Sequence, residues 1–244
     1  MVTLSIDTAA NFCAAALNDT ATGKLLSAVS RDIGRGHAEV LMAVINEVME
    51  QACINYQNID KIVTTLGPGS FTGVRVGIST ARAIGLGLSR PVVGISVLQA
   101  CAHHVVQINK RRFENRIVSV ILNARREEFY FQPFRNGEPV QEPELVDIEQ
   151  LVKFHEGFTA EEVVLCGSGA SKFLEKLAQL KLFAEFPIAH HLAAAPIEFV
   201  AELGTLCPVR KTRPEPIYLR GADAKKQQGF AIARAQHDDR NTVS

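Results

Sequence analysis

The sequence predicts an α/β protein built from two halves, each with three strands followed by a helix, a strand and a helix (βββαβα). Short alternating or β-branched apolar runs are followed by segments with helical periodicity, a succession typical of layered α/β packing. This order of elements occurs twice, although the two halves share no visible sequence identity. The 244 residues, 47% of them hydrophobic, are enough for one large or two small domains with a buried core.

The first half begins with a predicted meander of three strands, separated by Asn-Asp and Thr-Gly turn residues. An apolar helix, a buried β-branched strand, a helix rich in small residues, a short strand and a last helix follow it. In chain order we expect these elements at 2–6, 12–17, 25–29, 37–52, 61–66, 70–88, 91–94 and 96–106.

The second half contains another predicted meander, with an Asn-Gly hairpin turn at 136–137. A helix then starts with a capping box at Asp147, and a buried strand and two more helices follow. We expect these elements at 117–122, 127–134, 138–146, from 147, at 163–166, 170–180 and 196–206. The last helix is expected to start a few residues before 196.

The polar and basic segment 109–115 reads as a link between the halves. We therefore divide the chain into an N-terminal subdomain, 1–108, and a C-terminal subdomain, 109–222, which ends in a proline-rich, extended stretch. The polar residues 223–244 are predicted to be a flexible tail.

Composition excludes several classes of function. Lys plus Arg and Asp plus Glu number 26 each, so no overall basic field favours nucleic-acid binding. No apolar run reaches the roughly 18 residues of a membrane span, and the first residues lack the features of a secretory signal. The five cysteines are far apart and form no Cys-x-x-Cys pair, as expected for reduced thiols in a cytoplasmic protein.

The helix expected at 70–88 carries small residues at every fourth position. Gly73, Gly77, Ala81 and Gly85 share one slowly drifting face. Glycine costs roughly 1 kcal/mol relative to alanine inside a helix, so we infer that another backbone approaches this face closely. The approaching element could belong to the same chain or to another subunit, and the sequence leaves both open.

The glycine loop before this helix is a weak phosphate-binding signal. The stretch 67–73 (GPGSFTG) misses the dinucleotide fingerprint by one residue and lacks the Gly-Lys-Ser/Thr ending of a P-loop. At the end of the first strand, an ATPase fold would place a phosphate- or metal-binding carboxylate, but no glycine follows to admit a phosphate. The aspartate there is interpreted first as a turn cap. The weakly indicated nucleotide contacts are Asp7, Thr8, Gly167, Ser168 and Gly169.

The histidines do not have the spacing of a metal site. His37 starts the helix at 37–52, and the partner needed one turn later would be residue 41, which is leucine. The adjacent pairs at 103–104 and 190–191 would diverge by about 100° on a helix. No GxSxG motif is present, and nothing assembles a base, a nucleophile and an oxyanion hole. We therefore predict no catalytic residue and no metal ligand.

Several motifs along the chain resemble those of the bacterial TsaB family, also called YeaZ. The most specific is 67–77 (GPGSFTGVRVG). The others are 4–8 (LSIDT), 34–39 (GRGHAE) with Leu41, 94–98 (GISVL), 123–127 (NARRE) with Tyr130, 167–169 (GSG) and 215–220 (EPIYLR). The resemblance implies a duplicated actin-like, Hsp70-like (ribonuclease H-like) ATPase fold, shared with sugar kinases. Asn123 stands where the family usually has aspartate, which weakens any charge-dependent role of that loop.

The resemblance also implies a function. TsaB proteins are accessory subunits, without activity of their own, in making threonylcarbamoyladenosine beside the tRNA anticodon. They pair with the catalytic paralogue TsaD, the small ATPase TsaE joins the assembly, and in isolation they tend to form homodimers. No cofactor of its own is expected for this chain, ATP or ADP could bind at the complex interface, and tRNA would be contacted only indirectly.

This resemblance places the partner interface on the helices at 37–52 and 70–88 of the N-terminal subdomain. Docking is expected to hold TsaD in its competent conformation. A Gly77→Leu substitution is expected to prevent docking and leave the fold intact. The expected interface residues are His37, Val40, Leu41, Val44, Ile45, Val48, Gly73, Val74, Gly77, Ala81 and Gly85.

Two enzyme functions remain as alternatives. A metalloprotease of the M22 type needs paired histidine ligands, and this chain offers only one at 37 and 41. A small-molecule kinase of the same fold needs an Asp-x-Gly phosphate hairpin and a catalytic aspartate between the subdomains. The hairpin lacks its glycine, and no clear candidate exists for the aspartate.

Overall fold

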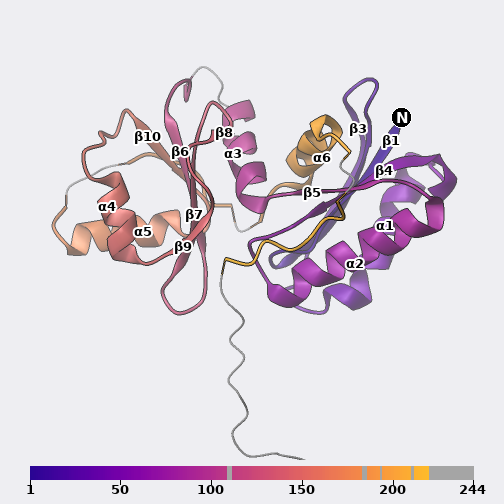
Figure 1. The fold of residues 1–244 in the computed structure, drawn as a ribbon, viewed down its shortest axis with the longest axis horizontal. Helices are drawn as coiled ribbons and strands as arrows, with labels where there is room; N and C mark the ends of the chain where they lie inside the picture. Colours follow the sequence, from indigo (N-terminus) through magenta and orange to yellow (C-terminus); the bar gives the residue numbers. More distant parts are fainter. Residues whose placement is uncertain (109–111, 183–185, 193, 210–211, 220–244) are drawn as a thin grey trace, which may run out of the picture.

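The structure, a computed structural model, describes residues 1–108, 112–182, 186–192, 194–209 and 212–219. Two mixed sheets form the centres of two halves that lie side by side (Figure 1). The predicted α/β class with a duplicated order of elements is confirmed. The tail predicted at 223–244 and part of the predicted link, 109–111, lie outside the described residues.

The first half follows the predicted order closely. Its elements are β1 (Val2–Asp7), β2 (Phe12–Asp19), β3 (Lys24–Asp32), α1 (His37–Ala52), the 3₁₀ turn η1 (Tyr56–Asn58), β4 (Ile59–Thr65), α2 (Phe71–Leu88), β5 (Val92–Ile95) and α3 (Val97–Ile108). The sheet order is β3-β2-β1-β4-β5. Strands β1, β4 and β5 are parallel, while β2 runs antiparallel to both of its neighbours.

The second half repeats this arrangement with shorter elements. They are β6 (Ile117–Asn123), β7 (Phe129–Arg135), β8 (Glu138–Pro139), β9 (Glu144–Val146), α4 (Ile148–His155), β10 (Val163–Cys166), α5 (Ala170–Gln179), β11 (Ile188–His190) and α6 (Ile197–Leu206). The sheet order is β11-β10-β6-β7-β8, and β9 also pairs with β7.

Two predictions for the second half were wrong, and one strand was missed. The strand expected at 138–146 is two short strands, because Pro139 and Pro143 cannot donate ladder hydrogen bonds. Strand β11 was not predicted. Helix α6 begins at Ile197, directly after Pro196, and not a few residues before 196. Each half therefore continues one strand and one helix beyond βββαβα.

Helices and sheets alternate in five layers (Figure 1). Helices α1 and α2 pack on the outer face of the first sheet, and α4 and α5 on the outer face of the second. Helices α3 and α6 lie between the two sheets and contact each other. Helix α3 packs on the second sheet, at β6, β7 and β10, whereas α6 packs on all five strands of the first. The predicted boundary at 108/109 thus divides the sequence, but each half supplies a helix to the other half's sheet.

The central core joins the two halves. Val63 of the first sheet, Leu98 of α3, Val120 of the second sheet and Val200 of α6 belong to one buried apolar cluster. The Lys61 side chain, only 3% exposed, reaches the end of α6 and donates hydrogen bonds to its carbonyl oxygens, including one of 2.6 Å. A positive charge at the C-terminal end of a helix is favourable, so this contact fixes α6 on the first sheet.

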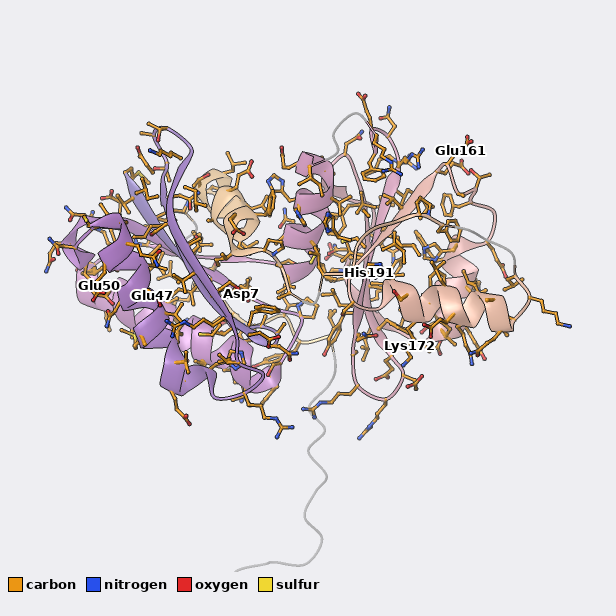
Figure 2. The ribbon with its side chains drawn as sticks, turned by 180° about the vertical axis from the view of Figure 1, so that it is seen from behind. Asp7, Glu47, Glu50, Glu161, Lys172 and His191 are labelled. Atoms are coloured by element: carbon orange, nitrogen blue, oxygen red, sulfur yellow. The ribbon has the colours of Figure 1, made fainter. Side chains whose placement is uncertain are left out.

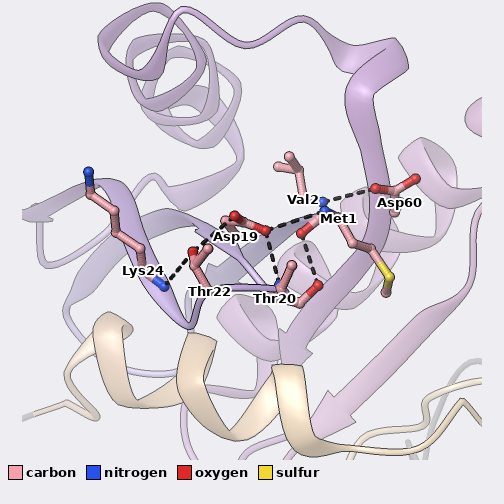
Figure 3. A network of polar contacts seen from close by, with 8 residues as sticks. Met1, Val2, Asp19, Thr20, Thr22, Lys24 and Asp60 are labelled. Carbon is pink, nitrogen blue, oxygen red and sulfur yellow. Dashed lines mark hydrogen bonds and ion pairs between the residues drawn. The ribbon is translucent and has the colours of Figure 1, made fainter.

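A polar network joins the N-terminal residue to the turn between β2 and β3 (Figure 3). The Asp19 carboxylate accepts hydrogen bonds from the Ala21 amide and the Thr22 hydroxyl, which hold the pKa of Asp19 below its usual value. The Val2 amide donates to the Asp60 carboxylate at 2.9 Å. These contacts hold the end of the first sheet at which strand β1 begins.

In the described part of the chain, no helix combines the length and the apolar character needed to cross a membrane.

Candidate functional site

Asp7 lies at the carboxyl end of β1, beside the end of the parallel strand β4. Its Oδ1 atom accepts hydrogen bonds from the Thr65 hydroxyl, at 2.6 Å, and from the Ala9 amide, at 2.9 Å. Burial raises the pKa of Asp7, and these hydrogen bonds offset part of that rise. Figure 2 shows Asp7 within the first half. Asp7 therefore caps the turn after β1 and ties it to β4.

The glycine loop before α2 packs directly against this turn. The Ser70 amide donates a 2.7 Å hydrogen bond to the Ala9 carbonyl, and a Cβ atom on Gly69 would overlap the same carbonyl oxygen. The Thr8 hydroxyl donates to the Gly73 carbonyl at 2.7 Å. The polar groups of the two loops thus bind each other at the place where an ATPase of this fold would bind phosphate.

The small-residue stripe of α2 faces the chain's own sheet. A Cβ atom on Gly77 would lie 2.5 Å from Thr8 Oγ1 and 3.3 Å from Thr64 Oγ1. One on Gly73 would overlap the Thr8 carbonyl, and one on Gly85 would lie 3.0 Å from the Arg90 carbonyl. The stripe allows α2 to approach β1, β4 and β5, so its assignment to a partner interface was wrong. A Gly77→Leu substitution would disrupt the fold itself.

Most of the other predicted interface residues also lie in the core. They pack between α1 or α2 and the first sheet, and Val40 alone among the eleven predicted residues is more than slightly exposed. The periodic apolar positions of an amphipathic helix normally face its own core. The buried residues are His37, Leu41, Val44, Ile45, Val48, Gly73, Val74, Gly77, Ala81 and Gly85.

The outer faces of α1 and α2 are exposed instead. Two apolar side chains there are well exposed, Met42 with an exposed fraction of 46% and Leu86 with 84%. A Cβ atom on Gly87 would meet nothing within 4 Å. We define the outer face as Ala38, Met42, Ala43, Ser79, Ala83, Leu86 and Gly87, all of which are exposed.

The sequence contains a partial signal for this outer face. Ser79, Ala83 and Gly87 form a second series of small residues at four-residue spacing, two positions beyond Gly77, Ala81 and Gly85. On α1, Ala38, Met42 and Ala43 already extend the apolar surface beyond one stripe. Spacing alone does not say which of the two series on α2 faces the sheet.

The second candidate loop lies in the other half of the molecule, before α5. Gly167 has a φ of 109°, and a Cβ atom there would overlap the Ile121 carbonyl. The Asn123 amide donates to Ser168 Oγ at 3.1 Å, and Asn123 Nδ2 donates to the Ser168 carbonyl at 2.8 Å. The second of these bonds needs a side-chain NH₂ group, which asparagine has and aspartate lacks. The Gly169 amide donates a further hydrogen bond, to the Ile121 carbonyl.

Potential metal ligands are scattered. His37 is buried at the start of α1, and Leu41, one turn later, belongs to the core under α1. Within the described ranges, no three or more His, Cys, Asp or Glu side chains are grouped so that they could hold a metal ion.

Comparisons with known proteins decide the family. A family model described as "TsaD: tRNA N6-adenosine threonylcarbamoyltransferase" matches residues 28–203. The "tRNA threonylcarbamoyladenosine biosynthesis protein TsaB" of Escherichia coli (strain K12) is 30% identical over 135 residues, 55% of each chain. The protein of that name from Bacillus subtilis (strain 168) is 25% identical over 92% of this chain and 97% of its own length. The chain belongs to the TsaB family.

The extent of these matches differs between relatives. The chain spans little more than half the length of several curated TsaB relatives, including 59% of the one from Buchnera aphidicola subsp. Schizaphis graminum, which is 28% identical. The solved structure "YeaZ from Pseudomonas aeruginosa" matches with a TM-score of 0.70 and 22% identity, over 89% of this chain and 99% of that chain. This likeness confirms the actin-like fold of two subdomains that the sequence predicts for a TsaB protein.

Proposed function

We propose that this chain is a non-catalytic partner subunit in the synthesis of threonylcarbamoyladenosine in tRNA, and that it docks and activates the threonylcarbamoyltransferase TsaD. Membership of the TsaB family supports the pathway. The docking role is supported by the outer face of α1 and α2, on which the exposed side chains of Met42 and Leu86 lie together with a stripe of small residues. In this proposal the protein acts in the cytoplasm.

The outer face has the composition that helix packing between subunits requires. Met42 and Leu86 would supply apolar anchors, whereas Ser79, Ala83 and Gly87 would let a partner helix approach to the lower end of the usual 8–10 Å range. A stable interface should bury roughly 1,000 Å² or more. TsaD would be activated because the docked form of this chain binds its competent conformation more tightly. In the absence of TsaD, a second copy would use the same face.

The enzyme alternatives receive no support from the site. The Asp7 carboxylate and the Thr8 hydroxyl already bind groups of their own chain, and Leu41 fills core space where the metal pair would need histidine. ATP or ADP at the complex interface, TsaE as a third partner and indirect contact with tRNA remain parts of the proposal.

The docking role can be tested with substitutions on the outer face. Ala83→Arg should block the close approach of a partner helix, and Leu86→Asp should remove an apolar anchor. Each should raise the dissociation constant of the complex with TsaD by about tenfold or more, a loss of about 1.4 kcal/mol, and so reduce co-elution. The melting temperature should be unchanged, because both side chains are exposed. Leu180→Asp is a matched control, since Leu180 is 50% exposed in the second half. Undiminished TsaD binding by both outer-face variants would refute the proposed interface.

Nucleotide binding can be tested separately by titration calorimetry. ATP is titrated into the chain alone, into TsaD alone and into the complex. We expect no binding by the chain alone, because the loops around Asp7 and Gly167 are closed by contacts within the chain. A stoichiometric heat signal from the chain alone would contradict this part of the proposal and favour a nucleotide-binding protein.

A further inference from the structure

Strand β5 has a free edge. It ends the first sheet and, among the described strands, pairs only with β4. The carbonyl oxygens of Pro91 and Ile95 accept hydrogen bonds from the β4 side. Because backbone groups alternate sides along a strand, the N–H and C=O groups of Val92 and Gly94 point away from β4. No backbone group of the described residues bonds to these four groups, so another strand can pair with this edge.

This free edge forms one wall of a cavity of about 680 Å³ between the two halves. The second sheet and the end of α6 contribute apolar side chains to the other walls, including Phe134 and Leu203. Ile217 also lines the cavity, but its amide donates to the Leu66 carbonyl after β4 and not to β5. The volume lies within the roughly 300–1,000 Å³ of typical ligand pockets, so a short peptide segment can be enclosed.

A buried side-chain amide in the cavity wall has an unused acceptor. Gln132 on β7 lines the cavity and is only 6% exposed, and its Nε2 donates a 2.9 Å hydrogen bond to the Gln141 carbonyl. Its Oε1 accepts no hydrogen bond from a described residue, yet it is not among the unpaired atoms that are fully enclosed. This oxygen is therefore open to a ligand and can accept from an N–H group bound in the cavity.

Two carboxylates make the lining of the cavity acidic. Glu142 and Glu215 are both exposed, and neither forms an ion pair with a described residue. Among the described residues of the lining, Arg213 is the one cation, so one negative charge is in excess. A strand edge, apolar walls, an unused acceptor and an acidic lining together fit an extended peptide with apolar side chains and basic flanks.

We propose that this cavity binds an extended segment of a partner protein, which adds a strand to the free edge of β5. Alternate residues of the segment form backbone hydrogen bonds with Val92 and Gly94, and a further N–H group donates to Gln132 Oε1. Apolar side chains at the centre of the segment pack against the apolar walls, and basic residues at its ends lie near the two carboxylates. The cavity shares no residue with the outer face of α1 and α2, so this site is independent of docking TsaD.

Amide hydrogen exchange in the full-length protein tests this proposal. The probe is the synthetic pentapeptide acetyl-Lys-Val-Phe-Val-Lys-amide, added in millimolar excess. Exchange of the Val92 and Gly94 amides should slow by about tenfold or more, whereas the Val93 and Ile95 amides, which face β4, should change by less than about twofold. Unchanged exchange at Val92 and Gly94 would overturn the proposal. Protection of these two amides before the probe is added would also overturn it, because the chain would then cover its own edge.

Two methylated probes test whether the peptide binds as a strand. In one probe both valine N–H groups are replaced by N–CH₃, and in the other only the phenylalanine N–H group is replaced. Because alternate residues of a strand face its neighbour, only one of the two probes should lose its protection of Val92 and Gly94. Loss with both probes, or with neither, would overturn the proposal.

Substitutions of exposed carboxylates test the charge of the ligand. Glu142→Gln with Glu215→Gln should weaken binding of the probe by about threefold or more in titration calorimetry. The matched control is Glu149→Gln with Glu161→Gln, which removes two exposed carboxylates outside the cavity and should leave the affinity unchanged. Equal affinities of the two variants would overturn the assignment of a basic peptide to this cavity.

Discussion

The Thr8 hydroxyl donates a 2.7 Å hydrogen bond to the backbone carbonyl of Gly73, and so joins the end of β1 to the first turn of α2. The Thr8 carbonyl occupies the space that a Cβ atom on Gly73 would need. One residue thus contacts the small-residue face of α2 through both its side chain and its backbone. The small residues of this face are therefore required by the protein's own fold, which leads to the first prediction.

Gly77→Ala should lower the free energy of unfolding by about 1–3 kcal/mol, because the added methyl group would lie 2.5 Å from Thr8 Oγ1. Gly87→Ala is the matched control on the same helix, since nothing lies within 4 Å of its added methyl group. It should raise the free energy of unfolding by up to about 1 kcal/mol through helix propensity. Urea unfolding of both variants measures the difference. Similar values for the two would show that Gly77 does not face the sheet.

Asp7→Asn should stabilise the protein increasingly as the pH rises. The pKa of Asp7 is raised by burial in the folded state, so the carboxyl ionises more readily in the unfolded chain. The wild type therefore loses stability as the pH rises from about 4 through the folded pKa, by up to about 1.4 kcal/mol per pH unit. The asparagine variant does not lose stability in this way, because its side chain does not ionise. Urea unfolding between pH 4 and 8 should show a difference that grows with pH; a constant difference would contradict the prediction.

His155→Phe should remove a loss of stability in acid. Burial among aromatic rings lowers the pKa of His155 from 6.5 to about 4, while its ring nitrogens contact the Ser119 hydroxyl and the Leu151 carbonyl. As the pH falls from 6.5 towards 4, the unfolded chain takes up a proton that the folded state excludes. The wild type should therefore lose up to about 1.4 kcal/mol per pH unit over this range.

In the phenylalanine variant the Ser119 hydroxyl loses its hydrogen-bond partner, so the variant should be less stable than the wild type at pH 8. The two proteins are therefore compared by how steeply the free energy of unfolding changes with pH, and not by its value at one pH. Its free energy of unfolding, measured with urea from pH 8 to 4, should fall less steeply than that of the wild type. Parallel curves would show that His155 takes up its proton equally in both states.

Asn123→Asp should destabilise the loop before α5 by about 1 kcal/mol, because a carboxylate cannot donate to the Ser168 carbonyl. Asn123→Ala is the control, since it removes the same hydrogen bond without adding charge. The aspartate variant should be the less stable of the two at pH 7, because two acceptor oxygens then face each other. Below about pH 4 the protonated carboxyl can donate, so the order should reverse. Urea unfolding of the aspartate and alanine variants at pH 7 and below about pH 4 measures this order, and the same order at both pH values would contradict the prediction.

Much of the fold could be predicted because local signals fix element boundaries. Helix α1 begins and ends at the predicted residues, Ser70 accepts the N-cap hydrogen bond of α2, and Asp147 forms the predicted capping box. Asn136 and Gly137 both adopt positive φ in the predicted hairpin turn. Each of these features depends on residues within a few positions of one another, so the sequence alone contains the information.

The partner of each helix face could not be predicted in the same way. Four-residue spacing on α2 indicates close approach, but Gly77 and Gly87 belong to similar series, of which only one meets the sheet. Strand β11 was missed because its three residues are too few to show a period. Helix α6 was recognised as a helix, yet its position on the first sheet depends on contacts with residues more than a hundred positions away, such as Lys61.

Helices α3 and α6, each packed on the sheet of the other half, determine when the protein can finish folding on the ribosome. The inner face of the first sheet, with Val63 and Ala16, stays uncovered until residues 197–206 have been synthesised. The N-terminal half therefore cannot complete its core as a separate unit while the rest of the chain is being made. A chain released after α3 would present that apolar face to chaperones and proteases, so premature termination should yield degraded protein rather than a working half.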